Sequence, residues 1–291
     1  MLVYLGIFVG FIILLSLYGF WQAIHPPKYI TNLTPKDLGW EFEEVRLITS
    51  DKVELAAWFV SHSAEASAGK PSSDKVIILL HGYPADKANL LQWAEFLHHD
   101  YNLFFLDFRY FGQSQGNLTT IGFHEQKDLT SALDYLTQRG QTKIGVMGFS
   151  LGGAVGILTA EKDQRIKAII SDSAFANLDL MGYEFYRKLF VLKYPLTALT
   201  KLWARIILGV DPSQVSPEKA AENLKIPILL IHSKADQTIP FENALRLQKA
   251  LQNNPKAEFF FPESDTHGYL PPTVLGVYQE KVLEFFKRNL K

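Results

Sequence analysis

The sequence predicts an α/β fold, in which a mostly parallel central sheet has helices on both faces. Two observations support this. Short apolar runs of strand length alternate along the chain with helical stretches of ten residues or more, and such helices are the connections between parallel strands. Several of these runs are apolar at every position, which is typical of strands buried on both faces. One large α/β domain accounts for most of the 291 residues.

The first segment, residues 1–27, is predicted to be a single transmembrane anchor. Residues 2–24 contain no charged side chain. As a helix they would be roughly 35 Å long, enough to cross a hydrocarbon core of about 30 Å. Tyr18 and Trp21 lie near the end of this run, where aromatic rings favour the membrane interface. Pro26 then ends the helix.

A cleaved signal peptide and a buried core helix are the alternatives for this segment. The apolar run is longer than that of a signal peptide, no Lys or Arg precedes it, and no small-residue cleavage site follows it. We therefore favour the anchor. The basic residues Lys28 and Lys36 come just after the span, an asymmetry that favours a cytoplasmic position for the domain over residues 28–291.

That domain begins with a predicted β-hairpin. Residues 42–49 and 53–60 alternate between apolar and polar side chains, and the Ser-, Ala- and Lys-rich residues 61–75 are predicted to form a surface loop. Strands and helices then follow one another. We expect strands over residues 76–80, 103–106, 144–147, 166–170, 228–231 and 258–261, and helices over residues 87–98, 125–139, 151–161, 241–252 and 274–289.

One segment interrupts this alternation. Residues 174–217 contain no strand pattern and are rich in aromatic and other apolar side chains. We expect them to form a helical cap that leaves the sheet at its carboxyl edge, where α/β folds bind their ligands. The side chains best suited to line a pocket under this cap are Tyr183, Phe185, Phe190 and Trp203.

The composition excludes several classes of function. With 29 Lys and Arg against 30 Asp and Glu and no basic stripe, nucleic-acid binding is not expected. The 47% of apolar residues excludes a disordered chain. Because there is no cysteine and no H-E-x-x-H motif, the sequence offers no disulfide, thiolate metal site or cysteine nucleophile, and we expect no metal and no cofactor.

Two segments match the G-x-S-x-G pattern of a nucleophile elbow, one around Ser150 and one around Ser114. An elbow needs a strand before the serine and a helix that begins at it, because this sharp turn exposes the hydroxyl group at the edge of the sheet. Ser150 has both neighbours. Ser114 is followed by loop sequence, so we assign Ser150 as the catalytic nucleophile and Ser114 as a turn residue.

A serine nucleophile needs a general base, which in this architecture follows it in the sequence. Only His232 and His267 come after Ser150. His232 ends a predicted strand, where it is expected to pack or form a hydrogen bond. His267 lies in the loop after the last predicted strand and is the candidate base.

The base in turn needs an orienting carboxylate. Asp236 lies just beyond the preceding strand and is the preferred candidate. Asp172, at the end of an earlier strand, and Asp265, close to the base in the sequence, are its rivals.

The oxyanion of the tetrahedral intermediate needs two N–H donors. The backbone of Leu151, directly after the nucleophile, is one candidate, and the backbone of Tyr83, in the loop after the strand over residues 76–80, is the other. Pro84 cannot donate. His81 precedes the serine in the chain, and we expect it to hold this loop in place.

The candidate residues belong to motifs that follow one another in a characteristic order. These are His81-Gly82, Asp107-Phe108-Arg109 with Gly112-Gln113-Ser114, Gly148-Phe149-Ser150-Leu151-Gly152-Gly153, Ser171-Asp172-Ser173-Ala174-Phe175, Asp236-Gln237-Thr238-Ile239-Pro240 and His267-Gly268. Together they resemble the α/β-hydrolase superfamily, and within it the serine-aminopeptidase-like and membrane-anchored esterase-like branches. The resemblance covers roughly residues 42–290. Tyr110 stands where these families often have glycine.

The resemblance implies a serine hydrolase that forms an acyl-enzyme on Ser150, with His267 carrying the proton and Asp236 orienting it. Its substrate would be a small-molecule carboxylic ester, including lipid-like esters and thioesters. Two alternatives stay open at this stage. One is an aminopeptidase-like amide hydrolase that uses the same triad, and the other is a membrane-tethered, non-catalytic binding protein on a hydrolase fold.

Overall fold

The computed structural model of the chain describes residues 1–62, 74–263, 267–268 and 271–291. Its centre is one sheet with the strand order β1-β2-β4-β3-β5-β6-β7-β8. The pairs β1–β2 and β2–β4 are antiparallel and all the others are parallel, so the predicted α/β class is confirmed. The strands are β1 (Phe42–Ile48), β2 (Glu54–Val60), β3 (Lys75–Leu80), β4 (Asn102–Leu106), β5 (Lys143–Phe149), β6 (Ile166–Asp172), β7 (Ile228–Ile231) and β8 (Ala257–Phe260).

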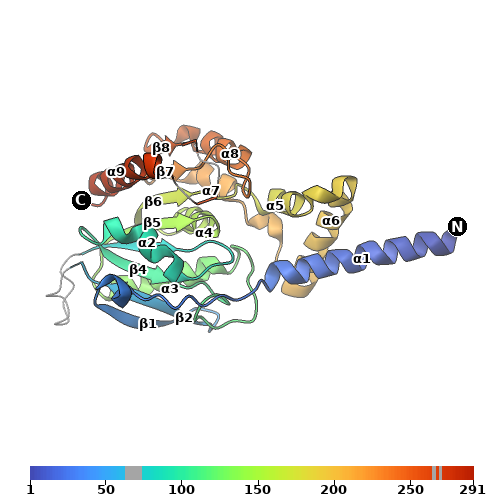
Figure 1. Ribbon diagram of the computed structural model, residues 1–291, viewed down its shortest axis with the longest axis horizontal. Coiled ribbons are helices and arrows are strands. Elements are labelled where there is room, and N and C mark those ends of the chain that lie inside the picture. Colours follow the sequence, from blue (N-terminus) through green and yellow to red (C-terminus); the bar gives the residue numbers. More distant parts are fainter. Residues whose placement is uncertain (63–73, 264–266, 269–270) are drawn as a thin grey trace.

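Helices cover both faces of the sheet and bury two apolar clusters against it (Figure 1). The helices α3 (Glu125–Gln138), α4 (Leu151–Ala160), α7 (Pro217–Asn223) and α8 (Glu242–Ala250) contribute to one cluster. The second cluster includes α2 (Leu91–Ala94) and α9 (Pro272–Asn289). Strands β3 to β6 lie between the two clusters, which explains their continuous apolar sequence.

The region before β4 differs from the prediction. Instead of one helix over residues 87–98 the chain forms three short pieces, which are 3₁₀ helices over Lys87–Leu90 and Glu95–Leu97 with α2 between them. The side chain of Asp86 accepts hydrogen bonds from the backbone of Ala88 and Asn89 and begins the first piece. Such short pieces tighten the turn and still bury apolar residues such as Leu97 against the sheet.

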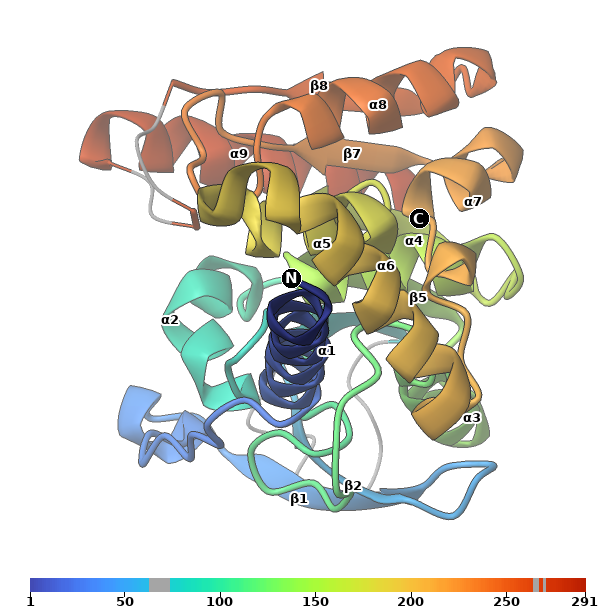
Figure 2. The same ribbon diagram turned by 90° about the vertical axis from the view of Figure 1, so that its right-hand side faces the viewer.

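The chain from the end of β6 to the start of α7 folds into helices, without a strand, and lies at one end of the sheet (Figure 1). Figure 1 shows α5 and α6 beside the inner half of the long helix α1 (Leu2–Ile24), whose N-terminal half projects away from the molecule. Figure 2 looks along α1 and shows α5 and α6 on one side of it. The segment consists of α5 (Leu178–Phe185), a 3₁₀ helix (Arg187–Leu192), α6 (Lys193–Trp203), a π-helical turn (Ala204–Leu208) and a 3₁₀ helix (Pro212–Gln214).

Candidate active site

Ser150 occupies a strained turn between β5 and α4. Its backbone angles are φ 53° and ψ −111°, a region that residues with a side chain rarely adopt and that is typical of a nucleophile elbow. Glycines make this turn possible, because a Cβ atom at Gly152 would collide with the backbone oxygen of Leu80 and one at Gly148 with the backbone of Gly152. The backbone N–H of Ser150 donates to the carbonyl of Asp172 (2.8 Å) and ties the turn to β6.

The second serine, Ser114, is part of a buried turn. Its Oγ donates to the backbone carbonyl of Asp107 (2.7 Å) and accepts from the backbone N–H of Ala56 (2.9 Å). Both hydrogen-bonding functions of the hydroxyl group are therefore used within the fold, and Ser114 has the structural role that the sequence suggested.

His267 and Asp236 lie in direct contact. The imidazole Nδ1 and the carboxylate Oδ2 are 2.6 Å apart, and Oδ1 of Asp236 accepts from the backbone of Thr238 (2.8 Å) and Ile239 (2.9 Å). Burial opposes ionisation of Asp236, but the hydrogen bonds from His267 and the two backbone groups outweigh it and hold the pKa of this carboxyl below its usual range. With Nδ1–H directed at an ionised carboxylate, Nε2 of His267 is left as the basic nitrogen.

Asp172, the rival acid that the structure describes, does not take this place. Asp172 ends β6, where its carboxylate accepts hydrogen bonds from Tyr278 Oη (3.0 Å) and Ser173 Oγ (2.9 Å). Burial raises the pKa of Asp172 to about 6, and these two hydrogen bonds only partly offset it. The side chain of Asp172 thus joins β6 to α9. Asp265 lies outside the described residues.

The other two buried histidines are held by the backbone. His81 accepts from the N–H of Phe108 at Nε2 (3.0 Å), so its proton is on Nδ1, where it donates to the carbonyl of Gly82 (2.7 Å). Burial lowers the pKa of His81 and keeps it neutral. His232 donates from Nε2 to the carbonyl of Ile239 (2.8 Å). His81 thus holds the loop after β3, and His232 forms a hydrogen bond, as the sequence suggested for each.

A cavity of about 510 Å³ adjoins Ser150 and His267. Tyr83 and Leu151, the two candidate oxyanion donors, also line it. Leu151 is the first residue of α4, and the first N–H groups of a helix have no partner within it. Among the described residues the hydrogen bond of His267 is to Asp236 and none joins it to Ser150. A hydrogen bond between a nucleophile and its base often forms only when substrate binds.

The walls of the cavity come largely from α1 and the cap, here defined as residues 174–217. Among the four aromatic residues expected to line it, only Phe185 does so. Phe190 is 81% exposed, and Trp203 packs on α1, where its Nε1 donates to Ser16 Oγ (3.0 Å). The aromatic prediction is therefore wrong for Tyr183, Phe190 and Trp203. Trp203 turns toward α1 and Phe190 toward the surface, and the ring of Tyr183 lies against that of Tyr194.

Sequence reasoning missed the part that α1 plays in the cavity. Gly19, Phe20, Ala23 and Ile24 line it, and Tyr83 Oη donates to the carbonyl of Ala23 (3.0 Å). A signal was available, because Ser16, Gly19 and Ala23 place small residues on one face of an otherwise bulky helix, a pattern typical of close helix packing.

In the part of the chain that the structure describes, no three His, Asp or Glu side chains are grouped so that they could hold a metal ion. The groups that surround the cavity include the hydroxyl of Ser150 and the imidazole of His267, which contacts the carboxylate of Asp236.

Comparisons with known proteins agree with this geometry. A model of the prolyl oligopeptidase family matches residues 115–291, more than half of the chain and including Ser150, Asp236 and His267. The chain belongs to this family. It is also similar to the fission yeast (Schizosaccharomyces pombe) protein bem46, with 27% identity over 88% of this chain and 80% of bem46, and to the Bacillus subtilis protein YqkD, with 29% identity over 72% of this chain and 70% of YqkD.

Among solved structures, the chain resembles the esterase Pf2001 of Pyrococcus furiosus, with a TM-score of 0.76 and 27% identity over 92% of this chain and all of the esterase. The resemblance to the α/β-hydrolase superfamily is thus confirmed. Membership of the prolyl oligopeptidase family and likeness to an esterase support a hydrolase of the serine type.

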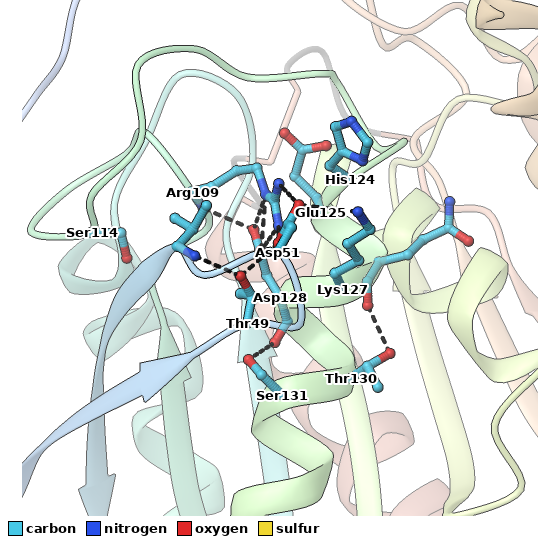
Figure 3. A network of polar contacts seen from close by, with 12 residues as sticks. Thr49, Asp51, Arg109, Ser114, His124, Glu125, Lys127, Asp128, Thr130 and Ser131 are labelled. Atoms are coloured by element: carbon cyan, nitrogen blue, oxygen red, sulfur yellow. Dashed lines mark hydrogen bonds and ion pairs between the residues drawn. The ribbon is translucent and has the colours of Figure 1, made fainter. Parts of the chain in front are cut away.

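In this member of the family, a buried ion-pair network holds the loop after β4 (Figure 3). Arg109 contacts Asp128 on α3 (2.7 Å) and Asp51 in the hairpin turn (2.8 Å), and its backbone N–H donates to Asp128 as well (2.8 Å). The next residue, Tyr110, has a positive φ of 74°, a backbone conformation that favours glycine. Its Oη donates to the carbonyl of Pro26 (2.6 Å), so this loop also fastens the end of α1.

Replacing Arg109 should be costly to stability. Arg109→Ala leaves the fully buried carboxylate of Asp128 without its partner, and we expect it to lower the free energy of unfolding by about 3–5 kcal/mol. Arg46→Ala is the matched control, because its ion pair with Glu54 (3.4 Å) is half-exposed and should be worth less than about 1 kcal/mol. Urea unfolding of both variants in detergent measures the difference. Equal losses of unfolding free energy in the two variants would show that the Arg109 network stabilises the fold no more than an exposed ion pair does.

Proposed function

We propose that the protein is a membrane-anchored serine hydrolase that cleaves carboxylic esters with apolar acyl groups. The observation that carries this proposal is the cavity itself, which Ser150 and His267 line together with apolar residues of α1 and the cap. The similarity to an esterase over nearly the whole chain supports the same bond class.

In the proposed mechanism, Ser150 Oγ attacks the ester carbonyl carbon while Nε2 of His267 takes its proton. Asp236 holds the imidazole through Nδ1 and stabilises the positive charge that forms on it. The backbone N–H groups of Leu151 and Tyr83 donate to the oxyanion. Return of the proton releases the alcohol and leaves an acyl-enzyme on Ser150. A water molecule, activated by His267, then releases the acid.

The helix α1 is proposed to be the anchor. It is 23 residues long with a mean hydropathy of 2.3 over its most apolar window, and only 17% of that window is buried. A core helix would be mostly buried. A cleaved signal peptide would remove a wall of the cavity and the hydrogen bond between Ala23 and Tyr83, so these contacts favour a retained helix. We keep the proposed cytoplasmic position of the domain as a part of this hypothesis.

Amide hydrolysis is the second candidate, and family membership favours it. An aminopeptidase needs a carboxylate for the substrate ammonium group. Asp179 and Glu184 are acidic residues that line the cavity, and Asp179 has a buried carboxylate oxygen without a partner. Its Oδ2 contacts Lys201 (2.8 Å), whereas its buried Oδ1 has no hydrogen-bond partner. The purified protein should therefore be tested with p-nitrophenyl esters of increasing chain length beside aminoacyl p-nitroanilides. Faster turnover of the anilides, lost in Asp179→Asn, would favour the peptidase.

The ester proposal makes a quantitative prediction for the cavity wall. Each additional methylene that enters it is worth about 0.8 kcal/mol, or roughly a fourfold gain in kcat/KM, until the cavity is filled. Ala23→Phe should shorten the longest acyl chain that gives this gain, without changing acetate hydrolysis, because Ala23 lines the cavity on α1. Leu14→Phe, on the exposed part of α1, is the control. An unchanged chain-length profile in Ala23→Phe would refute the role of α1 as a wall.

A further inference from the structure

The cap and α1 form one packed unit. Ile12, Phe20 and Ile24 of α1 are buried against cap residues, among them Leu196 and Ala204. The hydrogen bond between Ser16 and Trp203 lies in the same interface. A Cβ atom at Gly19 would collide with the hydroxyl group of Tyr186, so α1 and the cap are tightly packed at this point.

This packing limits how α1 can enter a bilayer. The contact with the cap starts at Ile12, so only residues 2–11 are free of it. At 1.5 Å per residue these ten residues reach about 15 Å, half of a hydrocarbon core of about 30 Å. If lipid covers more of α1 than this, the cap must enter the bilayer with it.

The surface of the cap is suited to a position within the bilayer interface. Between residues 185 and 210 the chain carries five basic residues and no acidic one, and basic side chains beside exposed apolar ones are typical of segments that lie in the interface of anionic membranes. Arg187, Lys201 and Arg205 also form ion pairs with acidic residues outside this range. The large exposed apolar side chains are Phe185, Leu189, Phe190, Val191, Tyr194, Leu202, Ile206 and Ile207.

The same cavity is lined by the candidate catalytic residues and by residues of α1 and the cap. Its lining includes Ser150 and His267, Phe20 on α1, and Ala204 and Leu208 on the cap. In Figure 1, α1 and the cap helices project from the same end of the molecule, beyond the edge of the sheet at which β5 ends. An acyl chain in the cavity would thus lie between the two segments that carry the exposed apolar surface.

We propose that the cap seats in one leaflet of the membrane beside α1, and that the active site takes the acyl chain of a lipid-like ester directly from that leaflet. The membrane part rests on α1 as the proposed anchor, and the substrate part rests on the proposed esterase function. The occupant of the exposed apolar surface is therefore lipid.

The depth of the cap can be measured directly, because the chain has no cysteine of its own. Phe190→Cys in the full chain is labelled with an environment-sensitive fluorophore and reconstituted in vesicles of phosphatidylcholine and phosphatidylserine. The label should be quenched by lipids with a nitroxide on the acyl chain and protected from iodide in the water. Gln138→Cys is the control, an exposed site at the end of α3 where β5 begins, opposite Ser150. A label at residue 190 that iodide quenches as strongly as the control label overturns the seating of the cap.

A second measurement tests the route of the substrate. The double variant Phe190→Ser with Val191→Ser should hydrolyse a long-chain ester embedded in those vesicles at least about tenfold more slowly, because it weakens the apolar contact with the leaflet. Soluble p-nitrophenyl acetate should be hydrolysed as by the unchanged protein. Leu245→Ser removes an exposed apolar side chain from α8 and should alter neither rate. An unchanged rate on the embedded ester contradicts the route.

The two proposals fail in different ways. If the protein hydrolyses no ester at all, the esterase function is wrong, yet the quenching of the label still reports the position of the cap. If acetate is hydrolysed and the label is exposed to water, the function stands and the membrane seating is wrong.

Discussion

Ser150→Ala is expected to lower ester hydrolysis by about 10⁶-fold, because no other hydroxyl group can take the place of the nucleophile in the elbow. The elbow backbone should persist, since its shape depends on the glycines at positions 148 and 152 and on the hydrogen bond from the Ser150 backbone to Asp172. Steady-state kinetics with p-nitrophenyl esters and labelling by a fluorophosphonate probe measure the loss.

Ser114→Ala is the matched control for that variant, because it removes the same atom from the second G-x-S-x-G match. It should remain active and react with the probe. Ser114→Ala should lower the free energy of unfolding by about 1–3 kcal/mol, because the buried N–H of Ala56 loses its acceptor. Substantial turnover by Ser150→Ala would refute the assignment of the nucleophile. If the unchanged protein does not react with the probe, the non-catalytic binding protein becomes the better hypothesis.

The second large effect is expected at the orienting acid. Asp236→Asn should reduce kcat by about 10⁴-fold, because an amide can hold His267 in the wrong tautomer and does not stabilise its positive charge. Asp172→Asn is the control and should retain activity, since the carboxylate of Asp172 is engaged with Tyr278 and Ser173. The reverse outcome, an inactive Asp172→Asn and an active Asp236→Asn, would exchange the two roles.

The same pair of variants should differ in the pH dependence of stability. The pKa of Asp172 is raised to about 6 in the folded protein from 3.8, so the folded state binds this proton more tightly than the unfolded state. Stability should therefore fall as the pH rises from about 4 to about 6, by about 3 kcal/mol, and stay lower above that range. Asp172→Asn should remove this fall.

For Asp236 the sign is opposite. Its pKa is lowered in the folded protein, so its contribution to stability is present above the unfolded pKa of 3.8 and is lost as the pH falls through the folded value. Denaturant unfolding of the two variants at a series of pH values separates these effects. If the stability of Asp172→Asn depends on pH in the same way as that of the unchanged protein, the carboxyl of Asp172 does not cause the fall in stability.

The strands and the elbow could be predicted because their signals are local. Strands β3 and β5 are continuous apolar runs, and Ser150 stands between a strand and a run of small residues, so neighbours in the sequence specify both. The order of the motifs along the chain placed His267 and Asp236 as candidates. Asp172 and Asp236 each follow a strand, so only the contact between His267 and Asp236 in space distinguishes them.

The sequence by itself determined the α/β class, the apolar N-terminal helix and the candidate nucleophile, base and acid, because periodicity and turn chemistry act over a few residues. Only the tertiary structure decided what lines the cavity. Trp203 and Phe190 are aromatic residues of the kind that line pockets, but Trp203 faces α1 and Phe190 faces the surface. Gly19 and Ala23 belong to the helix that the sequence predicts as a membrane anchor, yet they form a wall of the cavity. Which face of a helix meets which neighbour depends on packing between segments more than 150 residues apart, and that information is not contained in any local pattern.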